Sequence, residues 1–103
     1  MTSPREAQFQ ELVAEFPDSP MGHFSLGKLY LEERRYPEAV TSLTAATGLD
    51  PEYAAALVSL AEAQVGAGDV TAARATYARA KAKALEQKHA GLAEEIEGRL
   101  EEL

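Results

Sequence analysis

The residues of this chain that could do chemistry are two histidines and a short acidic run. His23 and His89 lie far apart in the sequence, and neither has a cysteine or another histidine at metal-ligand spacing. The acidic run, 94–97, falls in a helical pattern, where carboxylates usually face water. The chain also has no glycine-rich phosphate loop and no nucleophile elbow. We therefore predict no enzyme, no metal site and no cofactor, with His23 as a packing residue and His89 as an exposed turn residue.

Composition narrows the class of protein further. The chain has 103 residues, of which 46% are apolar and 26% charged, as expected of one folded domain. Seventeen acidic residues against ten basic ones give a net charge of −7, which disfavours nucleic acid as a partner. No apolar run approaches the roughly 18 residues of a membrane span, and the first residues lack a signal-peptide pattern. We expect an acidic cytoplasmic protein that does not insert into membranes.

Helix start signals recur along the chain. Ser3-Pro4, Ser19-Pro20 and Asp50-Pro51 each place an N-cap residue before a proline at the first helical position. Glu6 has the spacing from Ser3 that completes a capping box. Tyr36-Pro37 and Asp69-Val70 mark two further starts.

Helix stop signals come from glycine, which accepts the left-handed conformation that ends helices. These stop signals lie at Gly48 and at Gly66-Ala67-Gly68. The alternation of apolar and polar residues that would indicate strands is missing. The sequence therefore predicts an all-α fold. The expected helices span residues 3–16, 20–34, 37–48, 51–67, 70–87 and 90–102.

The sequence repeats itself with a period of 34 residues. Small residues at Gly27, Ala39 and Ala46 would let two antiparallel helices approach closely, while Leu26 and Leu43 fill the space beside them. One such hairpin cannot cover its own apolar stripe, so we expect hairpins to stack. The residues that coincide include Pro17 with Pro51, Leu26 with Leu60, Gly27 with Ala61, Ala39 with Ala73, Leu43 with Tyr77 and Ala46 with Ala80.

These positions resemble the tetratricopeptide repeat family, whose unit is a helix-turn-helix of 34 residues. The residues that match its pattern are Leu26, Gly27, Tyr30, Ala39, Leu43, Ala46 and Pro51, with His23 at the family's tryptophan position. In the next unit Gln64 replaces the tyrosine and Leu85 the proline, so the fifth helix can run on toward Gln87. The resemblance implies a right-handed superhelix, a solenoid of helical hairpins.

The resemblance also implies an organisation within the single domain, residues 1–103. It predicts a leading half-repeat helix at 3–19, full repeats at 20–53 and 54–87, and a capping helix at 88–103. Residues 74–88 carry a net charge of +4 and residues 89–103 a net charge of −4. Antiparallel packing would bring the two segments together, although each charge run could equally be a solvated face.

In this family the first helix of each repeat lines a concave groove that binds a peptide or a partner's helix. Helix geometry selects the residues that would lie on that face. They are Met21, Phe24, Ser25, Lys28 and Leu31 in the first repeat, with Ala55, Val58, Ser59, Glu62 and Val65 in the second. This mostly apolar surface would suit an amphipathic helix or a mixed peptide. In a second interpretation, Phe24 and Val58 pack between adjacent hairpins and bind nothing.

Two functions are consistent with these features. The first is a scaffold or adaptor whose groove binds a protein or peptide of unknown identity. The second is a self-assembling module that forms homo-oligomers through its terminal helices, because the first helix lacks the partner that a complete repeat would provide. A charge placed at Phe9 or Leu12 would dissociate such an oligomer.

Overall fold

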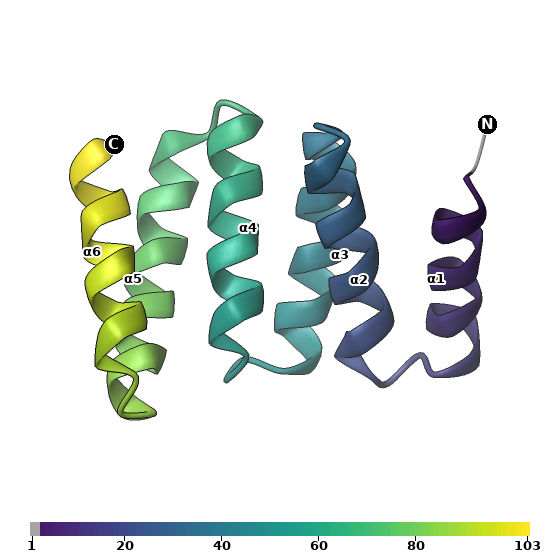
Figure 1. The fold of residues 1–103 in the computed structure, drawn as a ribbon, viewed down its shortest axis with the longest axis horizontal. Coiled ribbons are helices and arrows are strands. Elements are labelled where there is room, and N and C mark those ends of the chain that lie inside the picture. Colours follow the sequence, from purple (N-terminus) through teal and green to yellow (C-terminus); the bar gives the residue numbers. More distant parts are fainter. Residues whose placement is uncertain (1–2) are drawn as a thin grey trace.

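Helices make up nearly all of the chain in the computed structural model, which describes residues 3–103 (Figure 1). No strand occurs between residues 3 and 103, so the predicted all-α fold is confirmed. The helices are α1 (Pro4–Glu15), α2 (Pro20–Glu32), α3 (Tyr36–Leu49), α4 (Ala54–Gly66), α5 (Val70–Glu86) and α6 (Ala90–Glu102).

The helices are arranged as a short solenoid. Each helix packs against the next along the chain, and α2 also contacts α4. In Figure 1, α3 lies behind α2 and α5 lies behind α6, so that α2, α4 and α6 share one layer and α3 and α5 the other. α1 and α6 lie at opposite ends of the molecule, which measures 37 × 27 × 18 Å. Hairpins that contact only their neighbours in this way define a helical repeat architecture.

Two apolar clusters form the core, and α4 contributes to both. The first, which we call the α2–α3 core, joins Leu26 and Tyr30 of α2 to Ala39 and Leu43 of α3. Leu60 and Ala63 of α4 complete it, and Phe9 and Val13 of α1 pack on its edge. The second cluster joins α4, α5 and α6. Its buried members are Leu57, Ala61, Tyr77, Ala80, Ala84, Ala93 and Ile96. Alanines that repeat across both clusters let the helices approach closely, as the sequence pattern predicts.

Glycine is required where two helices touch. A Cβ atom added to Gly27 would lie 2.4 Å from Cγ of Leu43, which is fully buried. A Cβ atom on Gly66 would lie 2.3 Å from the ring of Tyr36. Gly27 thus allows α2 to pack closely on α3, and Gly66 allows α4 to pack closely on α3. Any side chain at either position would force the helices apart.

Three of the predicted N-caps are present. The side chains of Ser3, Ser19 and Asp69 accept hydrogen bonds from the backbone N–H groups of Glu6, Met21 and Ala72, at 3.1, 3.3 and 3.1 Å. Such bonds satisfy N–H groups that have no partner within the helix.

The N-cap predicted at Asp50 is wrong. Asp50 ends α3, and its carboxylate accepts from the N–H of Glu52 at 3.1 Å inside a turn. α4 therefore begins at Ala54, with Tyr53 as its N-cap, and not at Pro51. In this turn the N–H of Tyr53 donates to the carbonyl of Asp50 at 3.2 Å. The same turn occurs one period earlier, where the N–H of Ser19 donates to the carbonyl of Phe16 at 3.1 Å. Pro17 and Pro51 thus occupy equivalent turns.

Three helices end in the same hydrogen-bonded motif. After α2, the N–H groups of Arg34 and Arg35 donate to the carbonyls of Leu31 and Tyr30, at 3.0 and 2.8 Å. This is a Schellman motif, which needs a left-handed residue at its centre. The central residues of the three motifs are Arg34 (φ 57°) after α2, Gly68 (φ 86°) after α4 and Lys88 (φ 60°) after α5.

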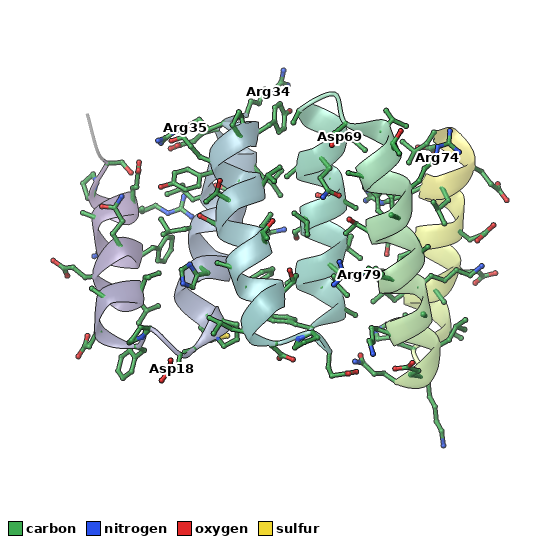
Figure 2. All side chains as sticks on the ribbon, turned by 180° about the vertical axis from the view of Figure 1, so that it is seen from behind. Asp18, Arg34, Arg35, Asp69, Arg74 and Arg79 are labelled. Carbon is green, nitrogen blue, oxygen red and sulfur yellow. The ribbon has the colours of Figure 1, made fainter. Side chains whose placement is uncertain are left out.

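The sequence predicted only the stop that uses Gly68. Gly48 does not end a helix, because α3 continues through it to Leu49. Figure 2 shows Arg34 and Asp69, which follow the ends of α2 and α4, at the same end of the molecule, opposite Asp18.

The last two helices follow the prediction more closely. α5 runs on to Glu86, past the position where α3 ends one period earlier, since Leu85 replaces the proline. α6 then packs against α5, and Lys81 pairs with Glu97 at 2.6 Å. The guanidinium of Arg74 donates to the carbonyl of Leu103 at 2.6 Å. Proximity of the two oppositely charged segments is therefore confirmed.

Candidate functional site

The predicted site residues lie on neighbouring helices of one layer. Met21, Phe24, Ser25, Lys28 and Leu31 belong to α2, and Ala55, Val58, Ser59, Glu62 and Val65 belong to α4, which contacts α2. α6 continues the same layer beyond α4 (Figure 1). We call the solvent-facing side of these three helices the α2–α4–α6 face, with Lys28, Leu31, Glu62, Val65, Arg99 and Glu102 as its defining residues.

The exposed members of the predicted set are Met21, Lys28, Ala55 and Val65. Met21 is 53% exposed and Val65 is 36% exposed, high values for large apolar side chains. Leu31 and Glu62 are half-buried. Ser59 is only 4% exposed, so its hydroxyl presents almost no surface to a partner.

Two predicted site residues are built into the protein's own packing. The ring of Phe24 lies against that of Tyr53, with centroids 4.9 Å apart, and it also packs on the α2–α3 core. Val58 packs against the core formed by α4, α5 and α6. Both side chains are half-buried and support the fold as well as the surface. A charge placed at either position would disturb folding, so neither is suitable for testing the face.

The third helix of the face, α6, adds charged residues that sequence reasoning missed. Arg99 lies 3.2 Å from a carboxylate oxygen of Glu62 on α4 and 3.5 Å from one of Glu95 on its own helix. Burial alone would lower the pKa of Arg99. The contacts with Tyr77 and Glu62 have a larger combined effect, so the pKa of Arg99 lies above its ordinary value. When the sequence is aligned with itself at an offset of 36 residues instead of 34, Ile96 of α6 coincides with Leu60 of α4. This alignment would have identified α6 as a further first helix.

A hollow lies between the C-terminal ends of α4 and α6. Buried Tyr77 of α5 is part of its lining, and burial raises the pKa of the Tyr77 hydroxyl. We call this feature the α4–α6 hollow. It is lined by Glu62, Val65, Tyr77, Arg99, Glu102 and Leu103.

A polar cluster ties α1 to the first hairpin. The carboxylate of Glu6 is nearly buried and accepts from the hydroxyl of Tyr30 at 3.0 Å and from the guanidinium of Arg35 at 2.8 Å. Arg35 stacks on the Tyr30 ring, 4.5 Å from its centroid, and also pairs with Glu33 and Glu38. Arg35 lowers the pKa of Glu6, burial opposes that effect, and Tyr30 lowers the pKa further. The predicted capping-box bond from Glu6 is replaced by this cluster.

The histidines occupy places that suit structural roles. His23 is half-buried on α2, at the predicted packing position. His89 is exposed, and its Nδ1 accepts from the N–H of Leu92 at 3.2 Å as the N-cap of α6. From residue 3 onward, no group of three or more His, Asp or Glu side chains could hold a metal ion. Over the same residues, no helix is both long and apolar enough to cross a membrane.

Comparison with known proteins agrees with this architecture. The family model described as tetratricopeptide repeat matches residues 4–42 and 24–87. The solution structure of protein BPP2914 from Bordetella parapertussis is 27% identical in sequence and superimposes with a TM-score of 0.81. That alignment covers 99% of this chain and 88% of the other. A search of curated proteins found no match.

Proposed function

The chain belongs to the tetratricopeptide repeat family, and we propose that it acts as a scaffold or adaptor whose α2–α4–α6 face binds a peptide or helix of a partner protein. Tetratricopeptide repeats generally mediate protein–protein interactions, and the family is typically non-enzymatic. In this proposal residues 20–53 and 54–87 are the two full repeats, residues 3–19 are a half-repeat and residues 88–103 are a cap.

One observation carries the proposal. One period of 34 residues separates Lys28 from Glu62 and Leu31 from Val65. The first of each pair lies on α2 and the second on α4, and these helices contact each other in one layer. Lys28 is exposed and Val65 is 36% exposed, so the face offers both charge and apolar surface. An extended segment or an amphipathic helix laid across the two helices would meet the same type of position twice.

The test compares the wild type with two variants that carry the same chemical change on opposite layers. Lys28→Glu/Val65→Glu alters the face, whereas Arg79→Glu/Leu85→Glu makes a similar change on α5, where Arg79 is exposed and Leu85 is 56% exposed. Each protein is first shown to be folded by circular dichroism. A lysate pull-down with mass spectrometry then identifies what each one captures.

We expect the wild type and the α5 variant to capture the same proteins and the face variant to lose them. Capture of the same proteins by all three would reject the α2–α4–α6 face as the binding surface.

A second copy of this chain is the alternative partner. The expected contact residues on α1, Phe9 and Leu12, are half-buried, and Phe9 packs on the α2–α3 core. Phe16 at the end of α1 is 52% exposed and offers an apolar contact without a role in that core. If α1 mediates self-assembly, Phe16→Glu lowers the sedimentation coefficient at high protein concentration. An unchanged coefficient would reject this interface.

A further inference from the structure

We propose that the α4–α6 hollow selects a partner segment that carries a lysine or arginine beside an aliphatic residue. The inference rests on the proposed function, since it specifies the chemistry of the segment that the α2–α4–α6 face binds. Three features of the hollow support it: its apolar walls, its excess of carboxylates and its position at two helix ends.

The walls of the hollow suit the stem of a long side chain. Val65 at the end of α4 is 36% exposed, and half-buried Leu103 follows the end of α6. The buried ring of Tyr77 contributes to the lining between them. Lysine and arginine bury their methylene stems along such surfaces while their charged groups stay near water and acidic partners.

Carboxylates outnumber cations around the hollow. Arg99 is the cation in the lining, and it is shared by Glu62 at 3.2 Å and Glu95 at 3.5 Å. Glu102 also lines the hollow, is exposed, and pairs with no cation among residues 3–103. The position that Arg99 takes beside Glu62 shows that a guanidinium fits here, and the exposed carboxylate of Glu102 is available to a second cation.

The helix ends add to the negative potential. Val65 lies in the last turn of α4 and Glu62 just before that turn, and Arg99 and Glu102 lie in the last turn of α6. Both helices end at the same end of the molecule (Figure 1). A helix carries partial negative charge at its C-terminus, so two such ends favour a cation between them. The chain itself illustrates this preference, because Arg74 donates to the carbonyl of Leu103 at 2.6 Å.

The position of Lys28 predicts the orientation of a segment bound on the α2–α4–α6 face. This exposed cation belongs to α2, and α2 and α6 lie on opposite sides of α4 (Figure 1). A bound segment would therefore place its basic residue over the α4–α6 hollow and an acidic or polar residue toward α2. Charge complementarity of this kind decides register and partner choice more than overall affinity.

The test uses a random peptide library displayed on phage and selected on the immobilised wild-type protein. The best peptide is synthesised, and its dissociation constant is measured by fluorescence polarisation. Glu102→Lys reverses the charge in the hollow, and Glu94→Lys makes the same change at an exposed residue of α6 that does not line it. Lys28→Glu/Val65→Glu serves as the variant of the whole face.

We expect the selected peptides to share a lysine or arginine. Glu102→Lys should weaken binding about ten-fold, which corresponds to about 1.4 kcal/mol, whereas Glu94→Lys should not. The loss should shrink at high salt because exposed charges are screened.

Peptides without a basic residue, or equal binding to the wild type and Glu102→Lys, would overturn the inference. If such peptides still lose binding to Lys28→Glu/Val65→Glu, the proposed function stands without the charge preference. If no peptide is enriched, or if that variant binds as the wild type does, the proposed function fails as well.

Discussion

Replacement of Gly27 by alanine should destabilise the protein, although alanine favours helix. An added Cβ atom would lie 2.4 Å from Cγ and 2.5 Å from Cδ2 of Leu43. Leu43 is fully buried in the core, so it can move away from an added methyl group only by displacing the side chains packed around it. The helix propensity of alanine contributes about 1 kcal/mol in favour of the variant. Overpacking at such a contact typically costs about 1–3 kcal/mol, and this close contact should bring the cost to the upper end.

The expected net loss of unfolding free energy is therefore about 1–2 kcal/mol, a fall in Tm of roughly 5–15 °C for a chain of this size. The assay is thermal unfolding followed by circular dichroism. Gly98→Ala is the matched control, because nothing lies within 4 Å of a Cβ atom added at Gly98. Its Tm should rise, since only the propensity gain of about 0.5–1 kcal/mol remains.

A double-mutant cycle tests the proposed cause. Leu43→Ala alone should cost about 2–5 kcal/mol by leaving a cavity. In Gly27→Ala/Leu43→Ala the added methyl group enters that cavity, so the double variant should lose less than the sum of the single losses. If Gly27→Ala raises Tm as much as Gly98→Ala does, or if the two losses simply add, the Gly27–Leu43 contact does not limit the approach of α2 and α3.

The remaining predictions concern a helix end, a core position and an acid-sensitive contact. Arg34→Gly should raise the unfolding free energy by about 1 kcal/mol in chemical denaturation, because glycine relieves the left-handed strain at φ 57°. Ala39→Leu should lower the unfolding free energy by about 1–3 kcal/mol, since Ala39 is fully buried between α2 and α3, and an unchanged Tm would refute that placement. Glu6→Gln should be less stable than the wild type at neutral pH. The pKa of Glu6 is lower in the folded protein than in the unfolded chain. Its contribution to the free energy of unfolding is therefore complete above the unfolded pKa of about 4.3 and is lost as pH falls through the folded pKa. Plots of unfolding free energy against pH for the two proteins should converge in acid.

Local and periodic features of the chain could be predicted because their causes lie within a few residues. The hydroxyl groups of Ser3 and Ser19 and the carboxylate of Asp69 cap helices through bonds to residues two or three positions away. The period of 34 correctly aligned Gly27 with Ala61, both of which are buried against neighbouring helices. Patterns of this kind require no knowledge of the tertiary fold.

Helix ends were harder to predict because residue type is a weak guide to backbone conformation. Arg34 and Lys88 adopt the left-handed conformation that glycine prefers, and Schellman hydrogen bonds hold them there. Gly48, by contrast, remains helical. Asp50-Pro51 resembled a helix start but forms a turn, since Pro51 is equivalent to Pro17 and not to Pro20. These boundaries are set by local hydrogen bonds and turns that residue type alone does not reveal.

The polar cluster on α1 could not be predicted from the sequence. Glu6 has the right spacing from Ser3 for a capping box, yet its carboxylate bonds to Tyr30 and Arg35, which lie 24 and 29 residues away. One period later, Val40 and Gln64 stand at the positions equivalent to Glu6 and Tyr30, so the pattern does not repeat. Among the described residues, the side-chain oxygen of Gln64 is buried without a hydrogen-bond partner, as expected where the acid–tyrosine pair is missing.

The candidate site was predicted only in outline. Of the residues that helix geometry assigned to the face, Lys28 and Val65 are exposed, but that geometry could not foresee that Phe24 stacks on Tyr53 or that Ser59 is buried. The contribution of α6 was missed, because the length of α5 moves the next first helix out of the 34-residue register. Which side chains become neighbours on successive repeats depends on the lengths of the helices between them.

Backbone amide chemical-shift mapping by NMR, with a peptide selected on the wild-type protein added to the labelled chain, tests directly which surface binds the partner. We expect the largest shifts on α2, α4 and α6, near Lys28, Val65 and Glu102, and only small shifts on the outer sides of α3 and α5. Shifts concentrated on α1, or on the exposed surface of α3 and α5 around Arg79, would contradict this expectation.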